Sequence, residues 1–352
     1  MTRLAPHVAL VMIARDEAAS IARALDSARP HVERMIVLDT GSVDDTPAIA
    51  QARGAEVHAF AWVDDFAAAR NAALARSDAA WNLVLDADEW IAADGAALAA
   101  LPARPDGRLG VVRLENVADE AGQEAGRSWL PRILPRGVCY QGRVHEQPVG
   151  GEGSFRTTLV LGHDGYTAAN LARKAGRNEG LLMAGIEASP EDAYLWYQLA
   201  REHQVRERPP QAALCFTEAL RLAPAGAPWR HGLVVRAITA LKTAGRLDEA
   251  LQLAGAEIEN WPESPDFYFA LGDLYLECAV QAPDRAAREF LPVVESAWKR
   301  CLDIGERPDL DAAVPGRGSH MAAHNLAALY ETLGLKDEAA RYQALAAQGR
   351  PR

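Results

Sequence analysis

The chain has 352 residues, of which 49% are hydrophobic and 24% are charged, and this length is enough for about two domains. Its formal net charge is −11; acidic residues outnumber basic ones by 23 to 18 up to residue 175 and by 25 to 19 beyond it. Because neither half is basic, nucleic acid is disfavoured as the main partner.

Cysteines and apolar runs bear on the compartment. The four cysteines are scattered, without the spacing of a metal site: Cys139, Cys215, Cys278 and Cys301. Cysteines scattered in this way usually act as small hydrophobic core residues in proteins of a reducing compartment. No apolar run approaches the roughly 18 residues of a membrane span, and the N-terminus lacks a signal-peptide cleavage pattern. We therefore expect a soluble cytoplasmic protein with no transmembrane segment.

The first half alternates apolar strands with amphipathic helices. Strands are predicted for residues 7–13, 34–39, 55–59 and a last run into 86, and helices for 17–28, 45–53 and 66–76. This rhythm predicts an α/β domain with a mostly parallel central sheet and helices on both of its faces.

Two polar loops follow the first two strands. They read Ala14-Arg15-Asp16-Glu17 and Asp39-Thr40-Gly41-Ser42-Val43-Asp44-Asp45-Thr46. Carboxyl ends of parallel strands are where open α/β sheets bind ligands, so these loops are expected to line a nucleotide cleft. Asp39 is placed to accept from a base or ribose, and Gly41 permits a tight turn. For Ser42 and Asp44, capping of the next helix is the simpler alternative.

Three carboxylates end the fourth apolar run. Asp86, Asp88 and Glu89 follow Trp81–Leu85, and an Asp-x-Asp pair at a strand end can hold Mg²⁺ or Mn²⁺ against a diphosphate. Taken alone, this triplet is weak evidence. No Walker A motif and no G-x-G-x-x-G motif follows the first strand, and His145-Glu146 lacks the second histidine of a zinc-protease motif.

The second half changes to helical repeats. In a 34-residue unit starting at Ala193, characteristic tetratricopeptide positions are filled by Trp196, Leu199, Ala200, Ala212, Phe216, Ala219 and Pro224, and His203 stands where an aromatic is usual. Further units start at His231 and near Pro265, the latter with an insertion around 281–292, and a fourth contains Tyr330 and Ala339. We expect a solenoid of stacked helix pairs. An unrelated helical bundle is the alternative.

Taken together, the first half resembles a glycosyltransferase family 2 catalytic domain of the GT-A fold. The resemblance is carried by the order and spacing of residues 14–17, 39–46, 65–71, 85–89, 131–133, 142–146, 163–166 and 174–178. Two positions depart from the family pattern: Val43 where Thr is usual, and Asp45 where Gly is usual. With repeats following, the layout is similar to the sublancin-type peptide S-glycosyltransferase subgroup. The expected domains are 1–175 for glycosyl transfer and 176–352 for the repeats.

The resemblance implies roles for particular residues. It implies Mn²⁺ or Mg²⁺ as cofactor, with Asp88, His163 and Asp86 as the metal-site residues. It implies nucleotide-sugar donor binding by Ala14, Arg15, Asp16, Glu17, Asp39, Gly41, Ser42, Asp44, Arg70, Asp86, Ala87, Lys174 and Arg177. A hydrogen-bonded structural role is the alternative for His163, and helix capping is the alternative for Lys174 and Arg177.

An inverting transfer needs a base for the acceptor proton. The candidates are Glu146, Glu89, Glu115 and Asp119, and Glu146 is favoured because it follows a glycine turn late in the catalytic half. The alternative is a structural Glu146, ion-paired with Arg132 or Arg143.

The leading hypothesis is an inverting, metal-dependent hexosyltransferase that uses a nucleotide sugar, expected to be a UDP-sugar. The acceptor is a peptide or protein, or a glycan, and the repeats are expected to help hold it. One alternative is a repeat scaffold with a degenerate nucleotide-binding domain. Another is a nucleotidyltransferase, which would need a glycine-rich phosphate loop where Ala14–Glu17 stand. The ends of repeat domains often pair between two copies of a protein, so a homo-oligomer is a further alternative for the oligomeric state.

Overall fold

The computed structural model describes residues 7–116, 127–164 and 177–349. Contacts within the protein divide it into two compact units, Met1–Leu181 and Leu182–Arg352. The expected boundary between residues 175 and 176 lies outside the described residues. No helix in the described ranges has both the length and the apolar character needed to cross a bilayer.

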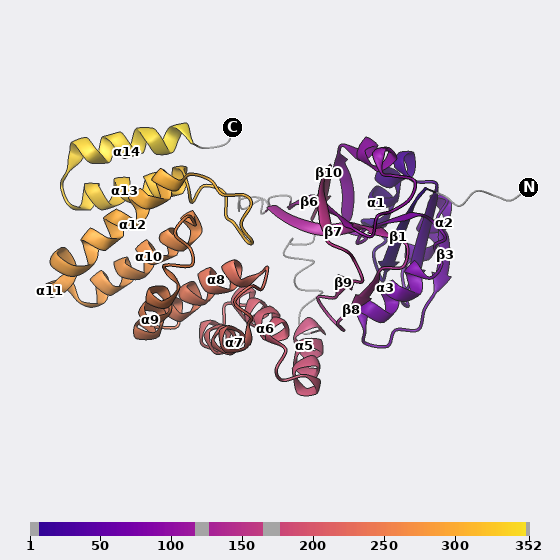
Figure 1. Ribbon diagram of the computed structural model, residues 1–352, viewed down its shortest axis with the longest axis horizontal. Coiled ribbons are helices and arrows are strands. Elements are labelled where there is room, and N and C mark those ends of the chain that lie inside the picture. Colours follow the sequence, from indigo (N-terminus) through magenta and orange to yellow (C-terminus); the bar gives the residue numbers. More distant parts are fainter. Residues whose placement is uncertain (1–6, 117–126, 165–176, 350–352) are drawn as a thin grey trace, which may run out of the picture. The chain divides into compact units, whose positions relative to one another are not determined.

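In the part of the chain that the structure describes, an eight-stranded mixed sheet forms the centre of the first unit (Figure 1). In spatial order its strands are β3 (Glu56–Ala59), β2 (Arg34–Asp39), β1 (Val8–Ala14), β4 (Trp81–Val84), β7 (Arg127–Pro135), β6 (Leu109–Asn116), β10 (Ser154–His163) and β5 (Glu89–Ala93). The first four strands are parallel, as the strand–helix rhythm predicts. Strand β7 is antiparallel to both β4 and β6, β10 is parallel to β6, and β5 is antiparallel to β10.

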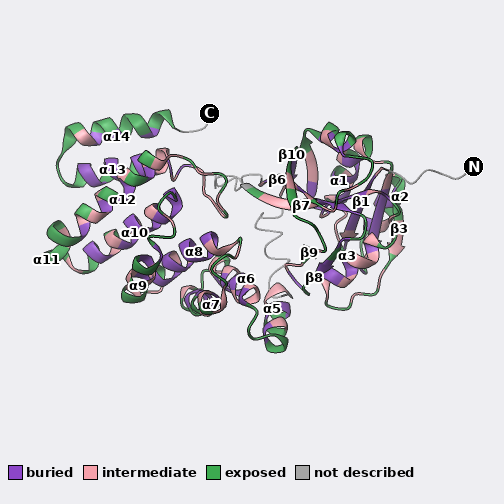
Figure 2. Ribbon diagram, in the orientation of Figure 1, coloured by how far each residue is buried: buried purple, intermediate pink, exposed green. Residues whose placement is uncertain are grey.

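Helices cover both faces of the parallel half. Side chains alternate along β1, so Leu10 and Met12 pack with Ile21 of α1 (Ile21–Ala28), whereas Val11 packs with Ala69 of α3 (Phe66–Leu74) on the other face. Helix α2 (Thr46–Ala52) connects β2 to β3. Burial on both faces explains why β1, β2 and β4 read as continuous apolar runs, whereas no residue of β3, at the edge of the sheet, is buried; Figure 2 shows β1 buried.

A small hairpin extends the first unit beside α3. Strands β8 (Cys139–Gln141) and β9 (Gln147–Val149) pair with each other and carry residues 142–146 between them. The amide of Phe66, at the start of α3, donates to the carbonyl of Arg143 over 2.8 Å. The start of α3 is thereby tied to the loop that contains Glu146.

The second unit consists of helices. After α5 (Arg177–Ala188), the pairs are α6 (Ala193–Val205) with α7 (Pro209–Leu222), α8 (Arg230–Thr243) with α9 (Leu247–Glu257), α10 (Pro265–Gln281) with α12 (Leu291–Ile304), and α13 (His320–Thr332) with α14 (Lys336–Gln348). Four helix pairs match the four predicted repeats. The insertion expected around 281–292 forms α11 (Pro283–Arg285) and a π-helical turn at Ala286–Phe290.

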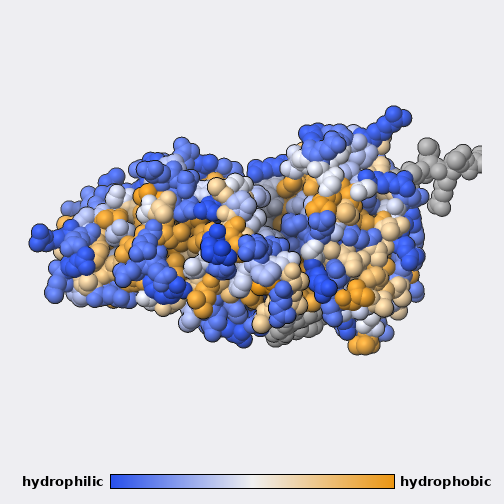
Figure 3. Space-filling view, turned by 60° about the horizontal axis from the view of Figure 1, so that its bottom comes forward, coloured by the Kyte–Doolittle hydropathy of each residue, from blue (hydrophilic) through white to orange (hydrophobic). Residues whose placement is uncertain are grey.

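Small and aromatic residues at the repeat positions pack the paired helices. Ala200, Ala212 and Phe216 are buried, so α6 and α7 approach closely. Exposed apolar side chains such as Val205, Leu214 and Val280 are scattered over the repeats, and Figure 3 shows apolar patches among hydrophilic ones there.

A long connection, residues 305–319, joins the third repeat to the fourth and folds back over the earlier ones. The carbonyl oxygen of Asp311 lies 2.5 Å from His231 Nδ1 at the start of α8. The amide of Val314 donates to the buried carboxylate of Asp266 at the start of α10 over 3.0 Å. These contacts fix the connection against the N-terminal ends of two repeat helices.

Candidate active site

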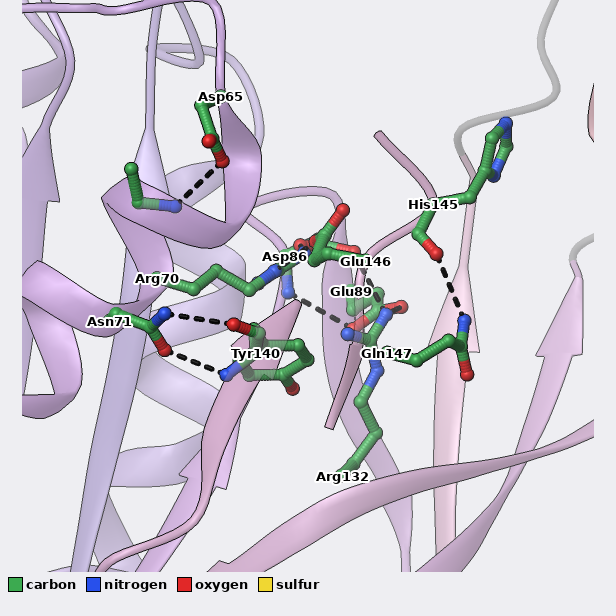
Figure 4. A network of polar contacts seen from close by, with 11 residues as sticks. Asp65, Arg70, Asn71, Asp86, Glu89, Arg132, Tyr140, His145, Glu146 and Gln147 are labelled. Atoms are coloured by element: carbon green, nitrogen blue, oxygen red, sulfur yellow. Dashed lines mark hydrogen bonds and ion pairs between the residues drawn. The ribbon is translucent and has the colours of Figure 1, made fainter. Parts of the chain in front are cut away.

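The centre of the candidate site is Asp86, which follows β4 and is held by two arginines (Figure 4). Arg70 Nη2 donates to Asp86 Oδ1 over 2.6 Å, and Arg132 Nη2 donates to Oδ2 over 2.8 Å. Arg70 comes from α3 on one face of the sheet, and Arg132 comes from β7 within it. Both oxygens of Asp86 are therefore fixed by guanidinium groups from separate elements.

Two further carboxylates complete this network. Arg70 Nε donates to Glu146 Oε1, and Arg132 Nη2 donates to Glu89 Oε1. Only 8% of the Arg70 side chain and 9% of the Glu146 side chain is exposed, so their ion pair is largely shielded from water. The prediction that Glu146 forms an ion pair is therefore confirmed, but the predicted partners, Arg132 and Arg143, are wrong. The partner is Arg70, because the start of α3 is tied to the 142–146 loop and this helix carries Arg70.

Burial and the two arginines set the charge states of this network. Burial would raise the pKa of Asp86, but the charges of Arg70 and Arg132 outweigh it and hold that pKa well below its usual range. For Glu89, burial dominates over the opposing charge of Arg132, and its pKa is raised. Burial also raises the pKa of the Tyr140 hydroxyl, and the Arg70 guanidinium lies over the Tyr140 ring, 5.5 Å from its centroid. Asp86 therefore stays ionised, and Glu89 is the carboxylate most ready to take a proton.

The network holds two buried donors without acceptors. Arg70 Nη1 and Arg132 Nε have no hydrogen-bond partner among the described residues. A buried N–H without an acceptor costs free energy, roughly 1–3 kcal/mol and more for a charged group. An anionic group that entered this site would supply the missing acceptors.

Asp88 and His163 lie beside this network. Asp88 Oδ2 is 3.6 Å from His163 Nε2, and both side chains are largely buried. Burial opposes protonation of His163, but the hydrogen bond and charge of Asp88 prevail, and the pKa of His163 is raised. Within the described residues, no three His, Cys, Asp or Glu side chains are grouped as a metal site. Asp86, the third predicted metal residue, instead has both oxygens on guanidinium groups.

The two polar loops are hydrogen-bonded to each other. Ser42 Oγ accepts from the amide of Asp16 over 3.0 Å, and Asp16 Oδ1 accepts from the amide of Val43 over 2.8 Å. Asp44 Oδ2 accepts from the amide of Ala18 over 3.1 Å, and the amide of Glu17 donates to Thr46 over 2.7 Å. Ser42 and Asp44 therefore connect the loops, in addition to the local capping contact that Asp44 makes with the amide of Thr46.

The remaining predicted donor residues are distributed as follows. Asp39 ends β2 and accepts from the amides of Gly41 and Ser42, each over 3.3 Å. Gly41 has a φ of +103°, which explains the glycine at this turn. Arg15 is exposed, whereas Ala14 and Ala87 are buried. Lys174 lies outside the described residues, as do Asp119, proposed above as a base, and the side chain of Arg177.

Arg132 was considered from the sequence only as an alternative partner of Glu146, and its contacts with Asp86 and Glu89 were not predicted. It stands in the apolar run Trp129–Leu134 of β7, where a lone charged residue is costly without a partner. A charged residue inside an apolar strand was the feature of the sequence that could have marked Arg132 as part of the site. Its partners Asp86 and Glu89 lie more than 40 positions earlier, after β4 and at the start of β5, and only the antiparallel pairing of β4 with β7 brings the strands together.

Comparisons with known proteins found one matching family model and several relatives. Residues 9–119 match the model of Glycosyl transferase family 2. A TPR repeat-containing protein of Synechococcus elongatus is 36% identical over 209 residues, which cover 55% of this chain and 51% of the relative. The SPbeta prophage-derived glycosyltransferase SunS of Bacillus subtilis is 25% identical over 217 residues, covering 59% of this chain and 51% of the relative. The matches to these curated relatives thus span about half of their length.

Two similarities to solved structures are weaker. MamA is 17% identical with a TM-score of 0.38, covering 52% of this chain and 94% of that one. Glucosyl-3-phosphoglycerate synthase from Mycobacterium tuberculosis is 25% identical with a TM-score of 0.27, covering 32% of this chain and 45% of that one. Both TM-scores lie below 0.5, so neither likeness bears on function. The first unit thus contains the match to Glycosyl transferase family 2, and tetratricopeptide-like helical repeats follow it along the chain.

Proposed function

We propose that this protein is a metal-dependent, inverting glycosyltransferase that moves a hexose from a nucleoside diphosphate donor, a UDP-sugar, to a peptide, protein or glycan acceptor. The observation that carries the proposal is the buried network around Asp86, in which Arg70 Nη1 and Arg132 Nε lack acceptors among the described residues. A donor diphosphate is an anion that would meet this need. An intact network of this kind also argues against a degenerate domain that serves only as a scaffold.

Asp88 and His163 are the residues that would hold a divalent metal. A carboxylate oxygen and an imidazole nitrogen, 3.6 Å apart, are a donor pair that suits Mn²⁺. When bound, the metal would neutralise charge on the leaving diphosphate. Asp86 would act from the neighbouring position by fixing Arg70 and Arg132.

Glu146 is the proposed base for the acceptor proton. Its Oε1 accepts from Arg70, and its Oε2 has no partner among the described residues, so one oxygen remains for a substrate hydroxyl or thiol. Arg70 orients the carboxylate in this scheme. Glu89 is a weaker candidate because it is almost fully buried and both its oxygens have partners, Arg132 and the amide of Asp86.

The linked loops are proposed to bind the nucleoside. Asp16, Ser42 and Asp44 hold the loops after β1 and β2 in one arrangement, which places Asp39 at the carboxyl edge of the sheet. This is the edge at which open α/β sheets bind ligands. The repeats, as the second unit, are proposed to help hold the acceptor.

The test is calorimetric titration of UDP into the full-length protein with Mn²⁺ and then with EDTA. Micromolar binding that disappears without metal supports the proposal and justifies a screen of UDP-sugars for hydrolysis. GDP and CDP serve as controls for the base. Absence of binding by all three nucleotides in both conditions would refute the proposal.

A further inference from the structure

The hairpin that carries Glu146 is separate from the central sheet. Within the described chain, β8 and β9 pair only with each other, so no strand pairing joins them to the eight strands of that sheet. The side chain of Glu146 nevertheless meets Arg70 of α3 in a largely buried ion pair. The position of Glu146 therefore depends on the contacts that hold the hairpin against this helix.

The loop between the two strands has a backbone conformation that needs such support. Gly142 has a φ of +99°, and His145, directly before Glu146, has a φ of +52°. The left-handed region is unfavourable for a residue with a Cβ, and such a residue keeps this conformation only where its surroundings hold it. The backbone that leads into Glu146 is thus one that the rest of the first unit must keep in place.

Asn71, which follows Arg70 on α3, forms two hydrogen bonds with the backbone of a single hairpin residue (Figure 4). Its Oδ1 accepts from the amide of Tyr140 over 2.7 Å, and its Nδ2 donates to the carbonyl of Tyr140 over 2.9 Å. A carboxamide suits this task because it carries an acceptor and a donor side by side. In β9, Tyr140 stands opposite Pro148, which has no N–H to donate. The Asn71 side chain therefore takes the place of a neighbouring strand for Tyr140.

Further contacts hold the hairpin on the same helix. The amide of Phe66 donates to the carbonyl of Arg143 over 2.8 Å. The side chain of Tyr140 is buried and belongs to one apolar cluster with Ala67 of α3. Helix α3 thus holds the hairpin at Tyr140 and Arg143, on the way into the loop, and also carries the arginine that binds the Glu146 carboxylate.

We propose that Asn71 is a positioning residue, which fixes the hairpin through Tyr140 so that the Glu146 carboxylate stays on Arg70 and faces the acceptor. The catalytic consequence rests on the proposed function, in which Glu146 is the base, but the placement of Glu146 does not. Without Asn71, the backbone amide and carbonyl of Tyr140 lose these partners, and the hairpin is free to shift along α3. A shift of about 1 Å in a reacting group is enough to slow a reaction about a hundredfold.

The test is NMR of the full-length protein labelled with ¹⁵N-arginine, following the Nε–Hε signal of Arg70, because this group donates to Glu146. Arg70→Lys assigns the signal, and Glu146→Gln gives its position when the ion pair is lost. The test variants are Asn71→Leu, which has no hydrogen-bonding group, and Asn71→Asp, which has acceptors but no donor when ionised. Gln141→Glu is the matched control, because it adds the same charge at an exposed hairpin position and leaves both hydrogen bonds of Asn71 in place.

In both Asn71 variants, the Arg70 signal should move toward its position in Glu146→Gln, whereas in Gln141→Glu it should stay where it is in the natural protein. Amides of β1 and β4 should remain protected from hydrogen exchange, which shows that the first unit is folded. An unchanged Arg70 signal in both Asn71 variants, or an equal displacement in Gln141→Glu, would overturn the proposal. Loss of protection of β1 and β4 in both Asn71 variants would also overturn it, because Asn71 would then stabilise the whole unit rather than position the hairpin.

Kinetics separate this proposal from the proposed function. With the UDP-sugar that the natural protein hydrolyses fastest, Asn71→Leu should lower kcat at least about tenfold while KM for the donor changes less than about twofold. An unchanged kcat despite a displaced Arg70 signal would overturn the catalytic part of the proposal. If the natural protein hydrolyses no UDP-sugar, the proposed function fails, whereas the NMR signals still decide whether Asn71 positions Glu146.

Discussion

Replacing Arg132 by Met tests whether the network around Asp86 is held together as described. Arg132 is the ion-pair partner of Glu89, whose side chain is only 2% exposed, and it also holds Asp86. Without it, Glu89 must either remain charged and buried or take up a proton. Removing one partner of a buried pair typically costs about 3–5 kcal/mol.

The free energy needed to protonate Glu89 gives a second estimate of the stability lost in Arg132→Met. With an unfolded-state pKa of about 4.3, holding Glu89 protonated at pH 7 costs roughly 3.7 kcal/mol, and at pH 5.5 roughly 1.6 kcal/mol. The pKa of Glu89 is already raised by burial, and loss of Arg132 raises it further. A raised folded pKa favours the folded state at low pH and loses that contribution as pH rises through it. The destabilisation of Arg132→Met should therefore shrink by about 2 kcal/mol between pH 7 and pH 5.5.

Hydrogen exchange of the amides in β1 and β4 provides the assay, because these strands report unfolding of the first unit separately from the repeats. Arg136→Met, an exposed position four residues further along, is the matched control and should change the free energy of unfolding by less than about 0.5 kcal/mol. The double variant Arg132→Met with Glu89→Gln should recover most of the loss. A deficit below about 1 kcal/mol, or one that does not change with pH, would refute the reasoning.

Three further outcomes are expected. Asp88→Asn should weaken UDP binding in Mn²⁺ at least about tenfold while the repeats unfold as before, and calorimetry together with circular dichroism checks this. Glu146→Gln should retain UDP binding but slow transfer by about 10²–10⁴-fold in single-turnover assays; unchanged turnover would remove it as the base. Gly272→Ala should lower stability by about 1–3 kcal/mol, because its Cβ would overlap the indole ring of Trp298, whereas Gly255→Ala meets no atom within 4 Å and should raise stability by about 0.5–1 kcal/mol in urea unfolding.

Local periodicity predicts much of the first unit. Strands β1 to β4 and helices α1 to α3 lie within a few residues of the predicted ranges, because an apolar run buried on both faces and a helical apolar stripe are visible in the residues themselves. The later strands β5 to β10 were not predicted. They are short or partly polar, and their burial depends on pairing with distant strands rather than on a pattern of their own.

The repeats were still more readable from the sequence. Each unit has its own set of small and large residues, such as Ala200, Ala212 and Phe216, and stacks mainly on its neighbours, so local sequence suffices to define it. The 305–319 connection is the exception. Its contacts with His231 and Asp266 join positions far apart in the sequence, and no repeat position predicts them.

The sequence by itself thus determined that an α/β domain with carboxylates at its strand ends precedes a set of helical repeats, because strand and helix periods and turn residues are local properties. Only the tertiary structure decided which charges meet. It brought Arg70 to Asp86 and Glu146, and Arg132 to Asp86 and Glu89. The physical reason is that the energy of an ion pair depends on distance and burial, which are set by strand order and helix packing rather than by sequence neighbours.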